Sequence, residues 1–123
     1  QRQMCIRDRE LARAAGADIC IDASSTDAAQ AIRAAAGGQG ADVVLETAGN
    51  NAGRELAIHA ARKQATIVVY GSAHHDVVFK PATFERILRH ELVIVGSWNS
   101  YSVPFPGKEW HDLIRFVEAG ELS

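Results

Sequence analysis

The chain has 123 residues, of which 47% are hydrophobic and 23% charged, and a formal net charge of −2. This length allows one domain with its own core, and the composition is typical of a soluble globular protein. The mildly acidic balance gives no reason to expect a nucleic-acid partner, and no apolar run approaches the roughly 20 residues of a membrane span. Two cysteines, Cys5 and Cys20, form no metal-type cluster and suit a reducing compartment, so we expect a cytoplasmic protein without membrane contact.

The first nine residues, Gln1 to Arg9, show no helical period, cap or turn signal. Met4 to Arg9 can be back-translated as ATG TGT ATA AGA GAC AGR, which resembles the end of a transposon adapter used in library preparation. We therefore predict that residues 1–9 are an assembly artefact and exclude them from fold reasoning, with an irregular native tail as the alternative.

The elements after the ninth residue are short. Residues 10–15 are predicted to end a helix at Gly16, because glycine is the usual residue just past a helix C-terminus. Residues 18–23 predict a strand, and residues 28–36 predict a helix that the polar residues 24–27 cap.

Three near-continuous apolar runs, rich in Val and Ile and each too short for a helix, follow at residues 41–47, 66–70 and 92–95. Such runs are typical of strands buried on both faces of a parallel sheet. Between them lie helical segments, the first capped by Asn50 or Asn51 and the second opened by Pro81. This alternation predicts a doubly wound α/β fold, in which ligands bind at the carboxyl ends of the strands.

A glycine-rich segment before the first of these strands and a helical segment after the last one are interpreted as structural elements. Gly37 to Gly40 precede a strand and do not open a helix, so we expect a turn and not a phosphate loop. A final helix over residues 108–119 is expected to bury Leu113, Phe116 and Val117.

Four segments together carry a family resemblance: ELARAAGAD, GGQGADVVLETAG, TIVVYGSAHHD and ATFERILRHELVIVGSWNSYSVPFPGKEW. They resemble the second half of the nucleotide-binding domain of the zinc-containing medium-chain alcohol dehydrogenases. The resemblance implies the C-terminal part of a doubly wound parallel (Rossmann) sheet of order 3-2-1-4-5-6, with strands 3–6 present and strands 1 and 2 lacking. Residues 10–123 would then be a partial NAD-binding domain.

The resemblance also implies an activity. Relatives that share the last segment oxidise a secondary alcohol of a polyol phosphate and pass hydride to NAD, with a catalytic zinc. The zinc ligands and the glycine-rich pyrophosphate turn are expected outside this chain, since a lone Cys20 cannot supply a zinc site. We therefore expect an NAD-dependent dehydrogenase at full length, no catalytic or metal-binding residue in this chain, and no activity from the chain alone.

Cofactor contacts are expected in the loops after the strands. By the resemblance, six residues line the nicotinamide half of the pocket, mainly through their backbone: Tyr70, Gly71, Ser72, Ser97, Trp98 and Asn99. Thr47, Ala48 and Gly49 would pass near the nicotinamide ribose or the adenosine side. Gly49 and Gly71 are small where a ring or ribose needs close backbone approach, although glycines that end strands are also ordinary turn residues.

Two further features have less specific interpretations. His74, His75 and Asp76 invite a metal hypothesis, but consecutive side chains of an extended loop point in opposite directions, which disfavours one shared ion. Glu46 interrupts an apolar strand at its carboxyl end, where we expect a hydrogen bond to the missing loop that belongs with strands 1 and 2, and no catalytic role.

The partner prediction concerns residues 92–95, which lack the Pro, Lys or bulge that usually protects an edge strand. We expect this strand to pair with its symmetry mate in a homodimer, as the family does, and we expect a small-molecule substrate. Two alternatives stay open. One is a zinc-free quinone or enoyl reductase, and the other is a non-catalytic α/β nucleotide-binding module.

Overall fold

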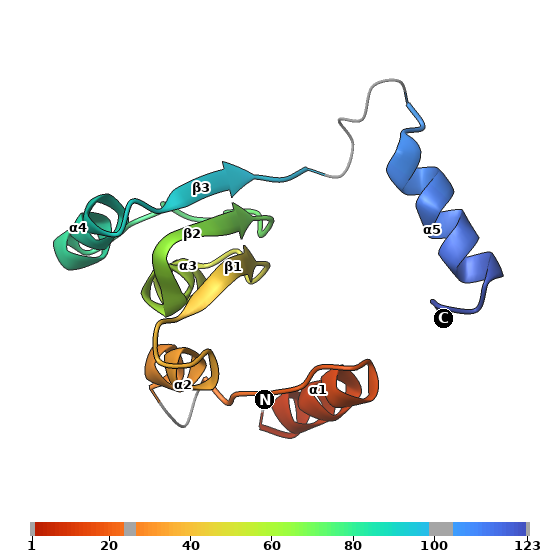
Figure 1. Ribbon diagram of the computed structural model, residues 1–123, viewed down its shortest axis with the longest axis horizontal. Coiled ribbons are helices and arrows are strands. Elements are labelled where there is room, and N and C mark those ends of the chain that lie inside the picture. Colours follow the sequence, from red (N-terminus) through yellow and green to blue (C-terminus); the bar gives the residue numbers. More distant parts are fainter. Residues whose placement is uncertain (1, 24–26, 99–104, 123) are drawn as a thin grey trace.

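The computed structural model describes residues 2–23, 27–98 and 105–122. Within these ranges, helices and strands alternate through the middle of the chain (Figure 1): α1 (Arg2–Ala14), α2 (Ala28–Ala35), β1 (Ala41–Glu46), α3 (Asn51–Ala60), β2 (Ala61–Val69), α4 (Pro81–Arg89), β3 (Val93–Gly96) and α5 (Lys108–Glu118). No helix of the described ranges is both long and apolar enough to cross a bilayer.

The three strands form one parallel sheet in the order β1-β2-β3. Val43, Thr66 and Val93 are in register across the sheet. One face is covered by α3, whose Ala57 and Ile58 pack against Ile67 in the core, and α4 packs against α3. This arrangement confirms the predicted α/β class and its parallel sheet, and it brings the carboxyl ends of all three strands to one edge.

Local signals in the sequence set most of the helix boundaries. Asn50 caps α3 by accepting a hydrogen bond from the Gly53 N–H at 2.8 Å, and Asp27 caps α2 in the same way through the Gln30 N–H. Gly16 follows α1 with a φ of +98°, and Ala17 N–H donates to the Ala12 carbonyl at 2.9 Å. This bond closes a Schellman motif, which confirms the predicted helix end.

The start of the chain differs from the sequence analysis in one unpredicted helix segment and in one predicted strand that is wrong. Residues 2–9 belong to α1, although they show no helical period. The segment contains no Gly or Pro and is rich in strong helix formers, so propensity suffices there without an amphipathic pattern. The artefact origin of residues 1–9 stays a prediction. Residues 18–23, predicted as a strand, do not join the sheet, in which β1 pairs only with β2. A strand needs hydrogen bonds to a neighbouring strand, and this segment has none among the described residues.

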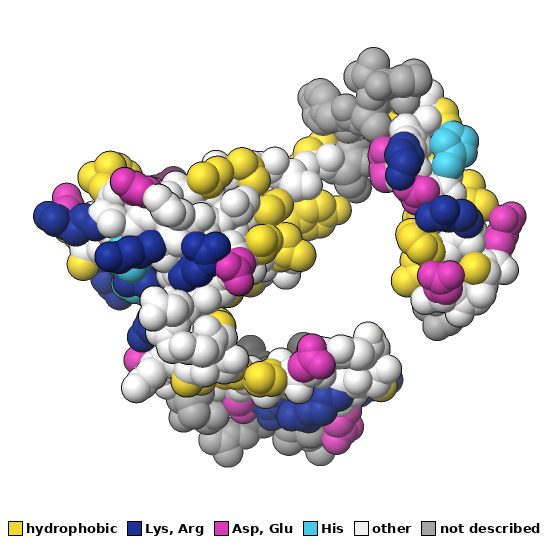
Figure 2. All heavy atoms as spheres, viewed as in Figure 1, with side chains coloured by type: hydrophobic (Ala, Val, Ile, Leu, Met, Phe, Trp, Pro, Cys, Tyr) yellow, Lys and Arg dark blue, Asp and Glu magenta, His cyan; other side chains and the backbone are white. Residues whose placement is uncertain are grey.

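Burial on both faces of the sheet is also not observed within the described residues. Val43 and Leu45 on β1 are 60% and 68% exposed, and all of β3 is exposed. Hydrophobic side chains gather on the side of the sheet toward α5 (Figure 2). The expected burial of Leu113, Phe116 and Val117 is wrong as well, since α5 stands apart from the sheet and buries no residue.

Arginines hold the C-terminal end of α3 against its neighbours. Arg86 of α4 donates to the carbonyls of Ile58 at 3.0 Å and Ala61 at 3.1 Å, and Arg33 of α2 donates to that of His59 at 2.8 Å. The His59 ring lies 3.2 Å from the Thr83 hydroxyl. Guanidinium groups thus satisfy carbonyls that a helix end leaves unpaired.

The positive charge of these arginines and the burial of nearby histidines make the free energy of unfolding depend on pH. Burial first, and then the Arg86 charge, lower the pKa of both His59 and His90 below the usual value. Both rings therefore bind a proton more readily in the unfolded chain. We expect the free energy of unfolding to fall as pH drops from about 7.5 to about 5.5.

Urea unfolding at several pH values measures this slope. The double variant His59→Gln/His90→Gln should lose most of the slope, whereas His111→Gln, on the exposed surface of α5, should keep it. A free energy of unfolding that stays flat or rises on acidification in the unmodified chain would contradict the assignment.

Candidate functional site

The loops after β1 and β2 meet at the carboxyl edge of the sheet. A Cβ atom added to Gly49 would collide with the backbone of Ser72, and one added to Gly71 would collide with the backbone of Gly49. Gly49 also has a φ of +69°, which few other residues adopt. The two glycines are therefore small because the loops touch each other, a different reason from the ligand clearance that the sequence suggested.

The predicted cofactor residues fall into two groups. Thr47, Ala48 and Gly49 follow β1, and Tyr70, Gly71 and Ser72 follow β2, so the structure brings these six together. Ser97 and Trp98 follow β3 at the same edge, with the Ser97 N–H bonded to the Val69 carbonyl at 3.0 Å and Trp98 63% exposed. Asn99 lies outside the described residues.

Glu46, the last residue of β1, forms hydrogen bonds to both loops. Its side chain is only 3% exposed, and Oε1 accepts a hydrogen bond from the Gly49 N–H at 2.8 Å. Its backbone carbonyl accepts the N–H groups of both Tyr70 and Gly71 at 2.9 Å. Glu46 therefore binds two loops of this chain, whereas its partner was expected from the sequence in a loop missing from it. The N–H groups of Gly49 and Gly71 therefore already donate hydrogen bonds to Glu46.

Arg54 is the site residue that sequence reasoning missed. It lies in the first turn and a half of α3, is 7% exposed, and donates from Nη2 to the Gly71 carbonyl at 3.1 Å. Its Nε is 3.9 Å from Glu46 Oε2. The available signal was Glu46 itself, because a carboxylate within an apolar strand requires a charged or donor partner nearby.

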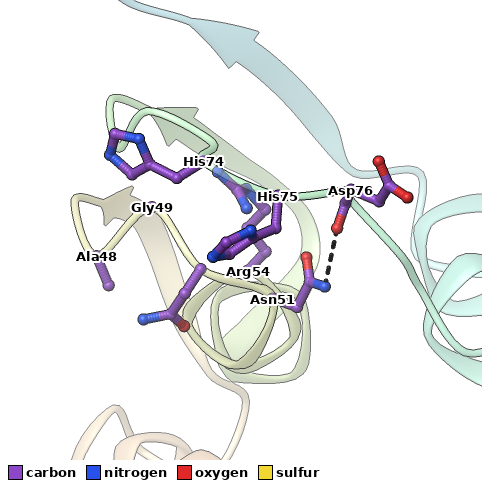
Figure 3. Close-up of a pocket in the computed structure, with 8 residues that line it drawn as sticks. Ala48, Gly49, Asn51, Arg54, His74, His75 and Asp76 are labelled. Carbon is purple, nitrogen blue, oxygen red and sulfur yellow. Dashed lines mark hydrogen bonds between the residues drawn. The ribbon is translucent and has the colours of Figure 1, made fainter.

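A pocket of about 280 Å³ opens beside this pair, between the start of α3 and the loop after Gly71. Ala48, Gly49 and Arg54 line one part, and His74, His75 and Asp76 line the other (Figure 3). Asn51 fastens the second loop by donating from Nδ2 to the Asp76 carbonyl at 3.1 Å. The pocket lies at the strand ends, where doubly wound folds bind their ligands.

The pocket does not resemble a zinc site. The His74 and His75 rings point in different directions, and the Asn51 contact is to the Asp76 backbone (Figure 3). In the ranges that the structure describes, no group of three or more His, Cys, Asp or Glu side chains lies close enough to hold a metal ion. These residues therefore do not fit a zinc ion.

Comparison with known proteins supports one family. The model of the family described as "Zinc-binding dehydrogenase" matches residues 6–119. Galactitol 1-phosphate 5-dehydrogenase of Escherichia coli K12 is 42% identical over 81 residues, which cover 66% of this chain and 23% of that protein. The chain thus spans about a quarter of the length of this curated relative.

Solved structures agree with this match. The crystal structure of galactitol-1-phosphate dehydrogenase from E. coli superposes with a TM-score of 0.84 at 36% identity, over 93% of this chain and 33% of that one. A Sinorhizobium meliloti structure, described as a putative zinc-binding dehydrogenase bound to NADP, gives 0.74 at 28% identity, over 94% and 32%. The chain has a parallel sheet of the predicted type, and the family model matches nearly all of the chain. The chain therefore belongs to the zinc-binding dehydrogenase family.

Proposed function

We propose that this chain is the nicotinamide-orienting part of an NAD-dependent dehydrogenase that oxidises a secondary alcohol of a polyol phosphate. The observation that carries the proposal is the interlocked pair of glycine loops, Gly49 against Gly71 and Ser72, at the carboxyl edge of the sheet. The 42% identity to an E. coli enzyme named for galactitol 1-phosphate supports the substrate class. The resemblance favours NAD as the cofactor.

The chain's own residues would orient the cofactor and exclude water. The bound dinucleotide would supply hydride-accepting chemistry, and a zinc ion held by residues outside this chain would polarise the alcohol. The carbonyl and side-chain groups of Thr47, Ala48 and Ser72 stand at the strand ends. Rigid loops there would keep the nicotinamide in one orientation, which is how a positioned reactant lowers a barrier. The chain alone is then expected to be inactive, and the enzyme cytoplasmic.

Binding of NADH to the complete gene product, followed by its fluorescence, tests this proposal. We expect a dissociation constant between about 1 µM and 1 mM. Gly71→Ala should weaken binding at least about tenfold, because its Cβ would push the two loops apart. Lys108→Ala is the control, since this exposed side chain at the start of α5 belongs to neither loop and not to β3.

The alternatives give different results in the same assay. A gene product that binds neither NADH nor NADPH at millimolar concentration would contradict the proposal and favour a non-catalytic module. A gene product that binds the cofactor, reduces quinones without zinc and leaves galactitol 1-phosphate untouched would favour the zinc-free reductase.

A homodimer through β3 is the second part of the proposal. β3 is at the end of the strand order, and Val93, Ile94 and Val95 are 50%, 43% and 41% exposed. No charged side chain or proline interrupts Val93–Gly96, so its free backbone groups can pair with a second copy. Antiparallel pairing across a two-fold axis would continue the sheet through both protomers.

Light scattering of the complete gene product measures this assembly. We expect a dimer that Ile94→Lys converts largely to monomer, because a charge would have to enter the paired edge. Lys108→Ala, a change at the exposed start of α5, should leave the dimer intact. A monomeric gene product, or a dimer insensitive to Ile94→Lys, would refute the β3 interface.

A further inference from the structure

We propose that Glu46 and Arg54 are positioning residues for the nicotinamide ring, an inference that rests on the proposed function. Together they contact both loops that would hold the cofactor, and both are largely buried, with Arg54 reaching the pocket wall only through a small exposed fraction. They would therefore act through the loops and not on the reacting atoms.

Glu46 contacts both loops. Its carboxylate fixes the loop after β1 through the Gly49 N–H, and its carbonyl fixes the loop after β2 through Tyr70 and Gly71. Gly53 permits this arrangement, because a Cβ there would lie 2.9 Å from Glu46 Oε1. One residue at the end of β1 thus sets the conformation of both loops.

Arg54 binds the loop after β2 and faces Glu46. Its Nη2 holds the Gly71 carbonyl, so the Gly71 peptide groups are bound on both sides, by Glu46 through N–H and by Arg54 through C=O. Its Nε faces Glu46 Oε2 at 3.9 Å and compensates the buried carboxylate. Hydrogen bonds that involve a charged group are the stronger ones, so this link restricts the Gly71 loop more than a neutral contact would.

Stability alone does not account for such a pair. Desolvating two charges is unfavourable, and well-packed apolar residues in place of a buried ion pair are often neutral or stabilising. The apolar core of this protein lies beside the pair, around Ile58 and Ile67, and could accommodate such residues. What the charged pair adds is a fixed geometry for Gly49 and Gly71. This geometry matters only if something must be oriented above them.

The test compares two ligands of the complete gene product: NADH, and ADP-ribose, which lacks only the nicotinamide ring. Arg54→Met removes the Gly71 link, and we expect NADH binding to weaken about tenfold while ADP-ribose binding stays within about twofold. Arg54→Lys keeps a cationic donor and should recover part of the NADH affinity. A general loss of structure would lower both affinities in parallel.

Arg86→Met is the matched control, because it removes another arginine that donates to backbone carbonyls, those of Ile58 and Ala61 near the opposite end of α3. It should lower the melting temperature and leave the ratio of the two affinities unchanged. If Arg54→Met does not fold, Glu46→Leu/Arg54→Met removes both charges together and should still show the selective loss of NADH affinity.

Three outcomes are distinguishable. A parallel loss for both ligands, or an unchanged ratio in a folded variant, overturns the positioning role and leaves the proposed function standing. An unmodified gene product that binds neither ligand overturns the proposed function, and the positioning role with it. A selective loss of NADH affinity supports both.

Discussion

Glu46 is the residue on which the arrangement at the strand ends depends. Its backbone carbonyl takes two N–H groups from the start of the neighbouring loop, and its carboxylate takes the Gly49 N–H of its own loop. A single residue thus pairs three backbone donors of the two loops. Arg54 completes the arrangement by compensating the charge and binding the Gly71 carbonyl. The close contact between Gly49 and Gly71 follows from these bonds.

The sheet beneath this edge is built asymmetrically within the described residues. One face is packed by α3, whose core residues include Ala57 and Ile58, and arginines from α2 and α4 bind the carbonyls at the end of α3. The opposite face exposes Val43 and Leu45. The packed helix layer therefore supports the two loops and fixes the position of the strand ends.

Most of the fold was predictable because its signals are local. Val- and Ile-rich runs predicted the three strands, Asn50 and Pro81 predicted helix starts, and Gly16 predicted a helix end. The failures concern partners that lie far away in sequence. Residues 18–23 have strand composition but no neighbour in the sheet, and the apolar stripe of α5, including Leu113, has no surface to cover within the described residues.

The position of the two loops was predictable, but the reason for their glycines was not. The rule that ligands bind at the carboxyl ends of parallel strands located the loops around Gly49 and Gly71 correctly at one edge. The reason for the glycines was different, since the close approach is between the loops. Arg54 was missed because an arginine in the first turns of a helix is usually solvated, and only the three-dimensional neighbourhood of Glu46 shows that it is buried.

Hydrogen exchange at the Gly49 and Gly71 amides tests the central claim most directly, because both loops are otherwise at the protein surface. If Glu46 binds these two N–H groups, their protection in the 123-residue chain should approach that of Val68 in the sheet, and Glu46→Ala should remove most of it at Gly49. Exchange of both amides at the rate of an unstructured peptide, in a chain whose Val68 amide is protected, would contradict the account.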